Sequence, residues 1–243
     1  MSSPADAPLE TSPATRSEVF GWAMYDFANS SYTTVIITVC YAVVFPRLIV
    51  GDGPDYRMGN LLWSVALSIS NLLVVFTLPF LGAVMDQVGR RKHFLLASTA
   101  ITALATASLF FAGPGDVVLA MVLVVISAYG FALGESFIAS FLPDLGAPEE
   151  LGRISGMAWG LGYVGGLMST AIVLFGLGPV ELENMGRQRW IGPITAGWFV
   201  LAAVPTFLLL RDRAVPRGGL GAETLRAGVQ QLVSTTKELS RYR

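Results

Sequence analysis

Residues 154–180 read ISGMAWGLGYVGGLMSTAIVLFGLGPV, 27 positions without a single Asp, Glu, Lys or Arg. Five further stretches lack these four residue types in the same way: 27–46, 60–85, 94–115, 117–134 and 190–210. A helix needs roughly 20 apolar residues to cross the hydrocarbon core of a bilayer, and each stretch is close to that length. The pattern predicts an all-α membrane protein with six transmembrane helices.

The composition of the whole chain agrees with this prediction. Of its 243 residues, 53% are hydrophobic and only 14% are charged, whereas a soluble domain carries roughly 25% charged residues. A soluble enzyme, a nucleic-acid-binding protein and a disordered chain are therefore excluded. Cys40 and His93 are the single cysteine and histidine, so no His/Cys metal site is expected. The spans carry no paired nucleophile and base, and neither enzymatic activity nor a cofactor is predicted.

Turn-forming residues divide the chain into segments. Gly and Pro cluster at 51–55, 113–115 and 143–148, where loops are expected. The spans are expected over 20–45, 60–84, 93–112, 117–141, 153–178 and 190–210. Three regions follow: a disordered cytoplasmic tail over 1–18, a six-span bundle over 19–211, and a cytoplasmic connector over 212–243. Leu225, Val229, Leu232 and Leu239 lie at helical spacing in the connector, which predicts an amphipathic helix.

The distribution of Lys and Arg predicts the orientation. An even number of spans places both termini on one side of the membrane. Of the 16 Lys and Arg residues, four fall on the opposite side (Arg47, Arg57, Arg187 and Arg189) and twelve on the side of the termini. Cytoplasmic loops carry the excess of basic residues. We therefore expect a multi-pass protein of the cell (inner) membrane with both termini in the cytoplasm.

The loop between the second and third spans carries a recognisable motif, Gly82-x-x-x-Asp86-x-x-Gly89-Arg90-Arg91. Glycine permits close helix approach, an aspartate accepts hydrogen bonds at a helix end, and arginines anchor the turn at the interface. The motif resembles the signature loop of the major facilitator superfamily, which lies at the same place on the cytoplasmic side. The resemblance implies that this loop is part of a cytoplasmic gate.

The loop between the fourth and fifth spans is predicted to help close the same side. Asp144 ends the fourth span much as Asp86 ends the second. Glu149 and Arg153 are four residues apart, a spacing that favours an ion pair at a helix start.

Two longer patterns narrow the resemblance. Residues 22–32 read WAMYDFANSSY, and FLPDL at 141–145 is followed by GRISGMAWGLGYVGG at 152–166. Both look like the vacuole-effluxer branch of the major facilitator superfamily, which is related to the autophagy-linked amino-acid exporters of fungal vacuoles. The resemblance covers residues 18–212 and corresponds to the first six spans of that family, one half built of two three-helix repeats. It implies transport of amino acids or related metabolites by alternating access. A truncated sequence and a homodimer both remain open as explanations of the single half.

A polar face on the first span points to the same function. Asp26, Asn29, Ser30 and Thr33 are spaced i, i+3, i+4 and i+7, and the face extends to Tyr41. A polar stripe on a membrane helix avoids lipid. It lines either a cavity that binds a solute or a hydrogen-bonded contact between helices.

Two further polar side chains lie within spans. Asn71 belongs to a weaker stripe on the second span, and Glu135 lies in the fourth. Ionisable residues inside a span are functional candidates. Asp26 and Glu135 in one cavity would suit a proton relay or a cationic group on the substrate; a Glu135 bonded to backbone or directed to the interface is the alternative.

Glycines at intervals of four predict close helix packing. They are Gly130 and Gly134 in the fourth span and Gly152, Gly156 and Gly160 in the fifth.

The sequence leaves two functions open. One is a secondary transporter, or its N-terminal half, and the other is a non-transporting receptor or scaffold built on a transporter-like half. The retention of Asp26 and Glu135 favours the transporter.

Overall fold

The computed structural model describes residues 14–51, 53 and 55–214. Within these residues every regular element is helical, and six helical segments are long and apolar enough to cross a membrane. The prediction of an all-α protein with six transmembrane helices is confirmed. The predicted amphipathic helix and residues 1–13 of the predicted tail lie outside the described residues.

The six membrane segments follow one another in the order expected. The first contains α1 (Arg16–Ser31), π-helical turns over Tyr32–Val39, α2 (Tyr41–Val44) and further π turns over Phe45–Val50. The others contain α3 (Arg57–Val88), α4 (Arg91–Ser108), α5 (Val117–Ala139), α6 (Pro148–Leu177) and α8 (Ile191–Leu209), with the short α7 (Met185–Gln188) before α8.

The first helix begins before the position where the predicted tail ends. Thr15 and Glu18 form a capping box: the Thr15 amide donates to Glu18 Oε2 at 2.8 Å, and the Glu18 amide donates to Thr15 Oγ1 at 3.3 Å. This reciprocal pair satisfies amides that a helix start leaves free. Arg16 to Glu18 therefore belong to α1 rather than to the tail.

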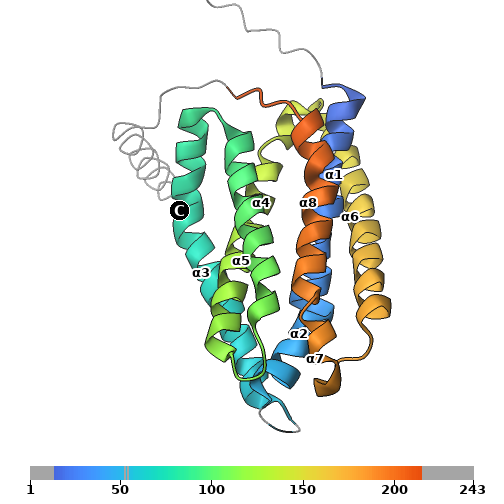
Figure 1. Ribbon diagram of the computed structural model, residues 1–243. Coiled ribbons are helices and arrows are strands. Elements are labelled where there is room, and N and C mark those ends of the chain that lie inside the picture. The colour runs from blue at the N-terminus through green and yellow to red at the C-terminus, as the bar shows by residue number, and fades with distance from the viewer. Residues whose placement is uncertain (1–13, 52, 54, 215–243) are drawn as a thin grey trace, which may run out of the picture.

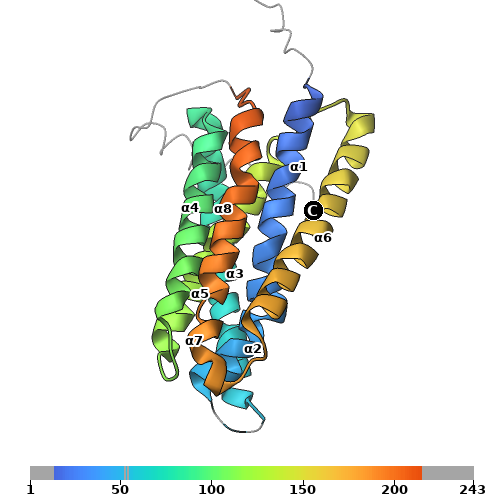
Figure 2. The same ribbon diagram turned by 45° about the vertical axis from the view of Figure 1, so that its right-hand side comes forward.

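The long helices lie side by side as an elongated bundle (Figures 1 and 2). α1 lies between α6 and α8, α4 contacts both α5 and α8, and α3 packs mainly on α5. Both ends of the described chain lie at the same end of the bundle (Figure 1). We call it the basic end, because seven described basic residues belong to it: Arg16, Arg90, Arg91, Lys92, Arg153, Arg211 and Arg213.

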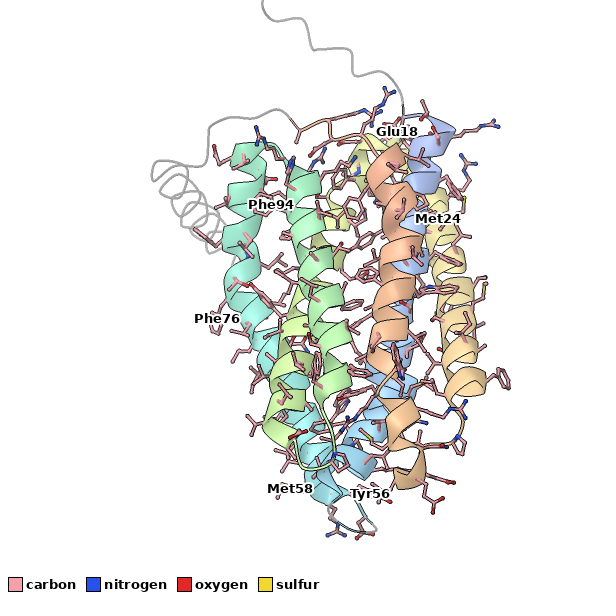
Figure 3. The ribbon with its side chains drawn as sticks, in the orientation of Figure 1. Glu18, Met24, Tyr56, Met58, Phe76 and Phe94 are labelled. Atoms are coloured by element: carbon pink, nitrogen blue, oxygen red, sulfur yellow. The ribbon has the colours of Figure 1, made fainter. Side chains whose placement is uncertain are left out.

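The outer surface of the bundle is suited to lipid. Large apolar side chains point away from the helices, among them Phe76, which is 73% exposed, and Phe175, which is 91% exposed. Figure 3 shows Phe76 on α3 pointing outward between Glu18 at the basic end and Tyr56 at the opposite end. Such a surface is stable in a bilayer and not in water.

Glycines bring α6 against α1 and α5 against α4. A Cβ on Gly165 would overlap the carbonyl oxygen of Phe27, and one on Gly166 would lie 2.9 Å from Thr34 Cγ2. On α5, a Cβ on Gly130 would lie 2.7 Å from Thr102 Oγ1 of α4, and one on Gly134 would lie 3.3 Å from Ser98 Oγ of α4 and against the Tyr25 hydroxyl of α1. These contacts need the small side chain, because the facing atoms belong to backbone or to buried groups.

The structure differs from the prediction at the other glycine row. Gly152, Gly156 and Gly160 have no atom of a neighbouring helix within 4 Å of a built Cβ. They lie on the open side of α6, and packing against α1 falls to glycines farther along the helix. The four-residue period identifies a face of α6 but not the neighbour that this face meets.

Candidate functional site

A cavity of about 240 Å³ lies where α1, α5 and α6 meet. α1 and the π turns after it contribute polar side chains, α5 contributes one carboxylate, and α6 contributes two aromatic rings and a glycine. The lining residues are Asp26, Asn29, Ser30, Thr33, Thr34, Glu135, Trp159, Gly162 and Tyr163. Nearly all of the wall comes from two helices whose contact is set by the α6 glycines.

The centre of the cavity is a hydrogen-bonded pair. The side-chain amide of Asn29 donates to Glu135 Oε1. Asn29 is 1% exposed, and its side-chain oxygen has no hydrogen-bond partner among the described residues. A buried polar atom without a partner is uncommon in native structures. The Asn29 side chain is therefore held by Glu135, with one acceptor left unused inside the protein.

Asp26 brings a second carboxylate to the same cavity. It lies against Gly162 of α6, where a Cβ would be 2.9 Å from Asp26 Oδ2 and 2.8 Å from Ser30 Oγ. A side chain at position 162 would push the carboxylate away from α6. Asp26, Glu135 and Trp159 also line a second cavity of about 160 Å³ that includes Trp22 and Leu142. The two carboxylates thus lie at the junction of two cavities.

Five of the predicted cavity residues are brought together by the fold: Asp26, Asn29, Ser30, Thr33 and Glu135. Tyr41 is not among them. It is 2% exposed and its ring lies 6.2 Å from that of Trp63. The physical reason is the π-helical stretch before it, in which Cys40 N donates to Val35 O; each wider turn holds more residues and rotates later side chains off the original face.

Asn71 lies exposed on α3 and does not line the cavity. α3 packs mainly on α5 and on the π turns over Phe45–Val50, so its polar stripe is not part of the cavity. Sequence reasoning missed Thr34, Trp159, Gly162 and Tyr163 as lining residues. The sequence carried one signal, because Trp159 and Tyr163 are four residues apart and therefore share a helix face. In the structure their ring centroids lie 6.1 Å apart.

Arg91 is the centre of a charged network at the basic end. It is 8% exposed, pairs with Asp144, and pairs with Asp212 at 3.3 Å. Its Nη1 donates to the Ser140 carbonyl at 2.7 Å, and its guanidinium lies 4.6 Å from the centre of the Phe141 ring. One side chain therefore connects the start of α4 to the end of α5 and to the residues after α8.

A second ion pair ties the start of α1 to the same region. Arg213 Nη2 lies 2.9 Å from Glu18 Oε1. Glu18 is 1% exposed, which sequence reasoning did not foresee for a residue assigned to a tail. Asp212 and Arg213 were also not identified in advance, because their partners lie more than 100 positions away in the chain.

The remaining residues of the predicted gate lie at the basic end without joining the network. Asp86 and Arg90 are exposed, and a built Cβ at Gly82 meets no atom within 4 Å. Gly89 ends α3 with a φ of 61°, a conformation that favours glycine. Arg153 pairs with Glu150 at 3.3 Å rather than with Glu149 as predicted, because in the first turns of α6 the carboxylate three residues before Arg153 lies closer.

Replacing Arg91 with methionine is expected to destabilise the bundle by about 2 kcal/mol. Asp144 and Asp212 would lose their shared cation in a region that water reaches poorly. Thermal unfolding of the full chain in detergent measures the effect. Arg153→Met is the matched control, because Arg153 is 80% exposed in its own ion pair and should change stability little. Equal shifts in the two variants would contradict a structural role for the buried network.

Comparisons with known proteins identify the family. Residues 62–243 match the family described as vacuole effluxer Atg22 like. The chain is also 26% identical over 199 residues to the uncharacterized MFS-type transporter YxiO of Bacillus subtilis (strain 168), a match that covers 79% of this chain and 46% of that protein. The chain thus spans about half the length of this curated relative. No solved structure matches the chain. With six helices in its described residues that are long and apolar enough to cross a membrane, the chain belongs to the vacuole effluxer Atg22-like branch of the major facilitator superfamily transporters.

Proposed function

We propose that the protein is a secondary active transporter that moves amino acids or related metabolites across the membrane by alternating access. The observation that carries the proposal is the cavity that Asp26, Asn29 and Glu135 line together. A carboxylate inside a membrane span is a candidate for a functional role, because an unpaired charge there is costly. The family and the relative support transport rather than catalysis.

The chemistry of the cavity fits a small cationic group. The two carboxylates are acceptors that match the donors of an ammonium group. The rings of Trp159 and Tyr163 line the same space, and aromatic faces attract ammonium ions. The cavity volume of about 240 Å³ is below the roughly 300–1,000 Å³ of pockets that bind drug-sized ligands, so it suits a small solute. The same carboxylates are also suited to carry a coupling proton.

The cavity forms one wall of a complete site. Transporters of this class enclose their substrate between repeats that rock against each other. A second six-span half, in a longer chain or in a second copy as a homodimer, would cover the open side of α6, where Trp159 is 65% and Tyr163 is 67% exposed. We propose that the basic end faces the cytoplasm of a cell membrane and that its ion pairs close that side.

Reconstitution into proteoliposomes tests the proposed function. We expect uptake of at least one labelled amino acid, saturable by the unlabelled compound, and measured with and without a pH gradient. A dependence on the gradient would assign a coupling proton. Thermal stabilisation by amino acids without any flux would instead favour the receptor or scaffold. Neither flux nor stabilisation by any amino acid, with insertion verified, would contradict the substrate class.

A further inference from the structure

A groove of about 300 Å³ lies between α4 and α8 and shares no residue with the cavity described above. Leu96 and Ala100 line it from α4, and Val200, Val204 and Phe207 from α8. Figures 1 and 2 show these two helices side by side along the bundle. The groove also contains Thr99, but its hydroxyl is bonded to Leu95 O and to the Tyr25 hydroxyl. The groove therefore presents an apolar surface.

The groove is open to the outside of the bundle. Leu96 is 52% exposed, Val200 is 46% exposed and Val204 is 43% exposed. These side chains belong to candidate membrane spans, so the medium that covers them is apolar. In a bilayer, lipid acyl chains cover such an apolar surface.

A lysine closes the groove at the basic end. Lys92 Nζ donates to Phe207 O at 2.7 Å and to Leu210 O at 2.8 Å, which holds the ammonium group across the ends of the two helices. An ammonium group has three donors, so one remains for a further acceptor. Because Phe207 also lines the groove, the ammonium group lies next to its apolar wall.

Two more donors lie beside Lys92. His93 is exposed and precedes Leu96 and Ala100 by three and seven positions, which places it on the groove face of α4. Arg211 is exposed and lies between Leu210 and Asp212, both of which accept hydrogen bonds from Lys92. No ion pair with another described residue engages Arg211.

Nearby carboxylates do not cancel this positive charge. Asp212 accepts from Arg91 Nε at 3.3 Å and from the Lys92 amide at 3.0 Å, and Asp144 pairs with Arg91. Asp86 is exposed at the end of α3, and Arg90 is exposed two residues after that helix ends. Lys92 and Arg211 therefore remain available to an anion.

We infer that the α4–α8 groove binds an anionic phospholipid, with an acyl chain along the apolar wall and the phosphate held by Lys92, His93 and Arg211. Basic pockets between membrane helices at the cytoplasmic side bind anionic headgroups. The charge at the mouth selects the headgroup, and the groove holds the chain. The inference is independent of the transported solute.

Native mass spectrometry of the full chain in detergent tests the site. The probes are phosphatidylglycerol and phosphatidylcholine with identical acyl chains. We expect phosphatidylglycerol to remain bound at several-fold lower lipid concentration than phosphatidylcholine. The double variant His93→Glu, Arg211→Glu is expected to lower phosphatidylglycerol affinity by about tenfold and to leave phosphatidylcholine unchanged. Lys92 is kept, because it caps α8.

A second variant tests the groove itself. Val204→Trp fills the apolar wall and is expected to displace both lipids, whereas Val118→Trp introduces the same ring on α5 at a side chain that is 75% exposed and should change neither. Equal retention of the two lipids, or unchanged phosphatidylglycerol binding in the double variant, would overturn the inference. Should Val204→Trp fail to fold, the double variant at the surface decides alone.

Discussion

Glu135→Gln and Asp26→Asn are each expected to reduce transport strongly while leaving the fold intact. Both substitutions keep the shape of the side chain and remove its charge. The Asn29 amide can still donate to the oxygen of a glutamine at 135, so the contact between α1 and α5 should persist. A hydrogen bond to a charged group contributes about 1.5 to 3 kcal/mol, which corresponds to roughly 10- to 150-fold in affinity.

Flux in proteoliposomes, measured as a function of substrate concentration and pH, checks this prediction. Loss of affinity without loss of maximal rate would assign the carboxylate to substrate binding. Loss of the pH dependence of flux would assign it to a coupling proton. Ser64→Ala is the matched control, because Ser64 is a polar residue of a span that bonds only its own helix at Asn60 O.

The double variant adds a further test. Asp26 and Glu135 line one cavity, and residues that share a site give non-additive effects. We expect the flux of the double variant to be only slightly below that of the single variant with the lower flux. Wild-type flux in both single variants would contradict the prediction and would leave the two carboxylates with structural roles only.

Gly165→Ala and Gly160→Ala are expected to change stability in opposite directions. A Cβ at 165 would overlap the carbonyl oxygen of Phe27 and lie 3.0 Å from its ring, whereas a Cβ at 160 meets nothing within 4 Å. Overpacking costs about 1 to 3 kcal/mol, and here backbone would have to move. At 160 alanine gains up to about 1 kcal/mol from its helix propensity.

Thermal unfolding of the two variants in the same detergent measures the difference. The substitution and the helix are the same, so propensity cancels and only the contact with α1 differs. Gly165→Leu is expected to prevent folding. A Gly165→Ala variant as stable as Gly160→Ala would show that α6 does not pack on α1 in the manner described.

Several features of the site were predictable because they depend on residues close together in the chain. The face of Asp26, Asn29, Ser30 and Thr33 follows from helical spacing, and the structure places all four in one cavity with Glu135. The start of α1 was missed, because Thr15 and Glu18 were assigned to the tail although they form the pattern of a capping box. These signals need no knowledge of neighbouring helices.

Other features were not predictable from spacing. The face of α1 does not continue to Tyr41, because π turns intervene. Arg91 is held by Asp144 and by Asp212, and no local pattern selects these two among the acidic residues of the chain. The mouth of the α4–α8 groove likewise depends on Lys92 reaching the carbonyls of Phe207 and Leu210.

The sequence by itself determined that the described residues carry six helices long and apolar enough to cross a membrane, because the cost of placing charge in hydrocarbon acts on every window of about 20 residues. Only the tertiary structure decided which glycines pack, which carboxylates meet and which arginine is buried. Gly152, Gly156 and Gly160 share the spacing of packing glycines, yet Gly162, Gly165 and Gly166 meet α1. Helical period defines a face, but the partner of that face is set by side-chain fit between segments distant in the chain.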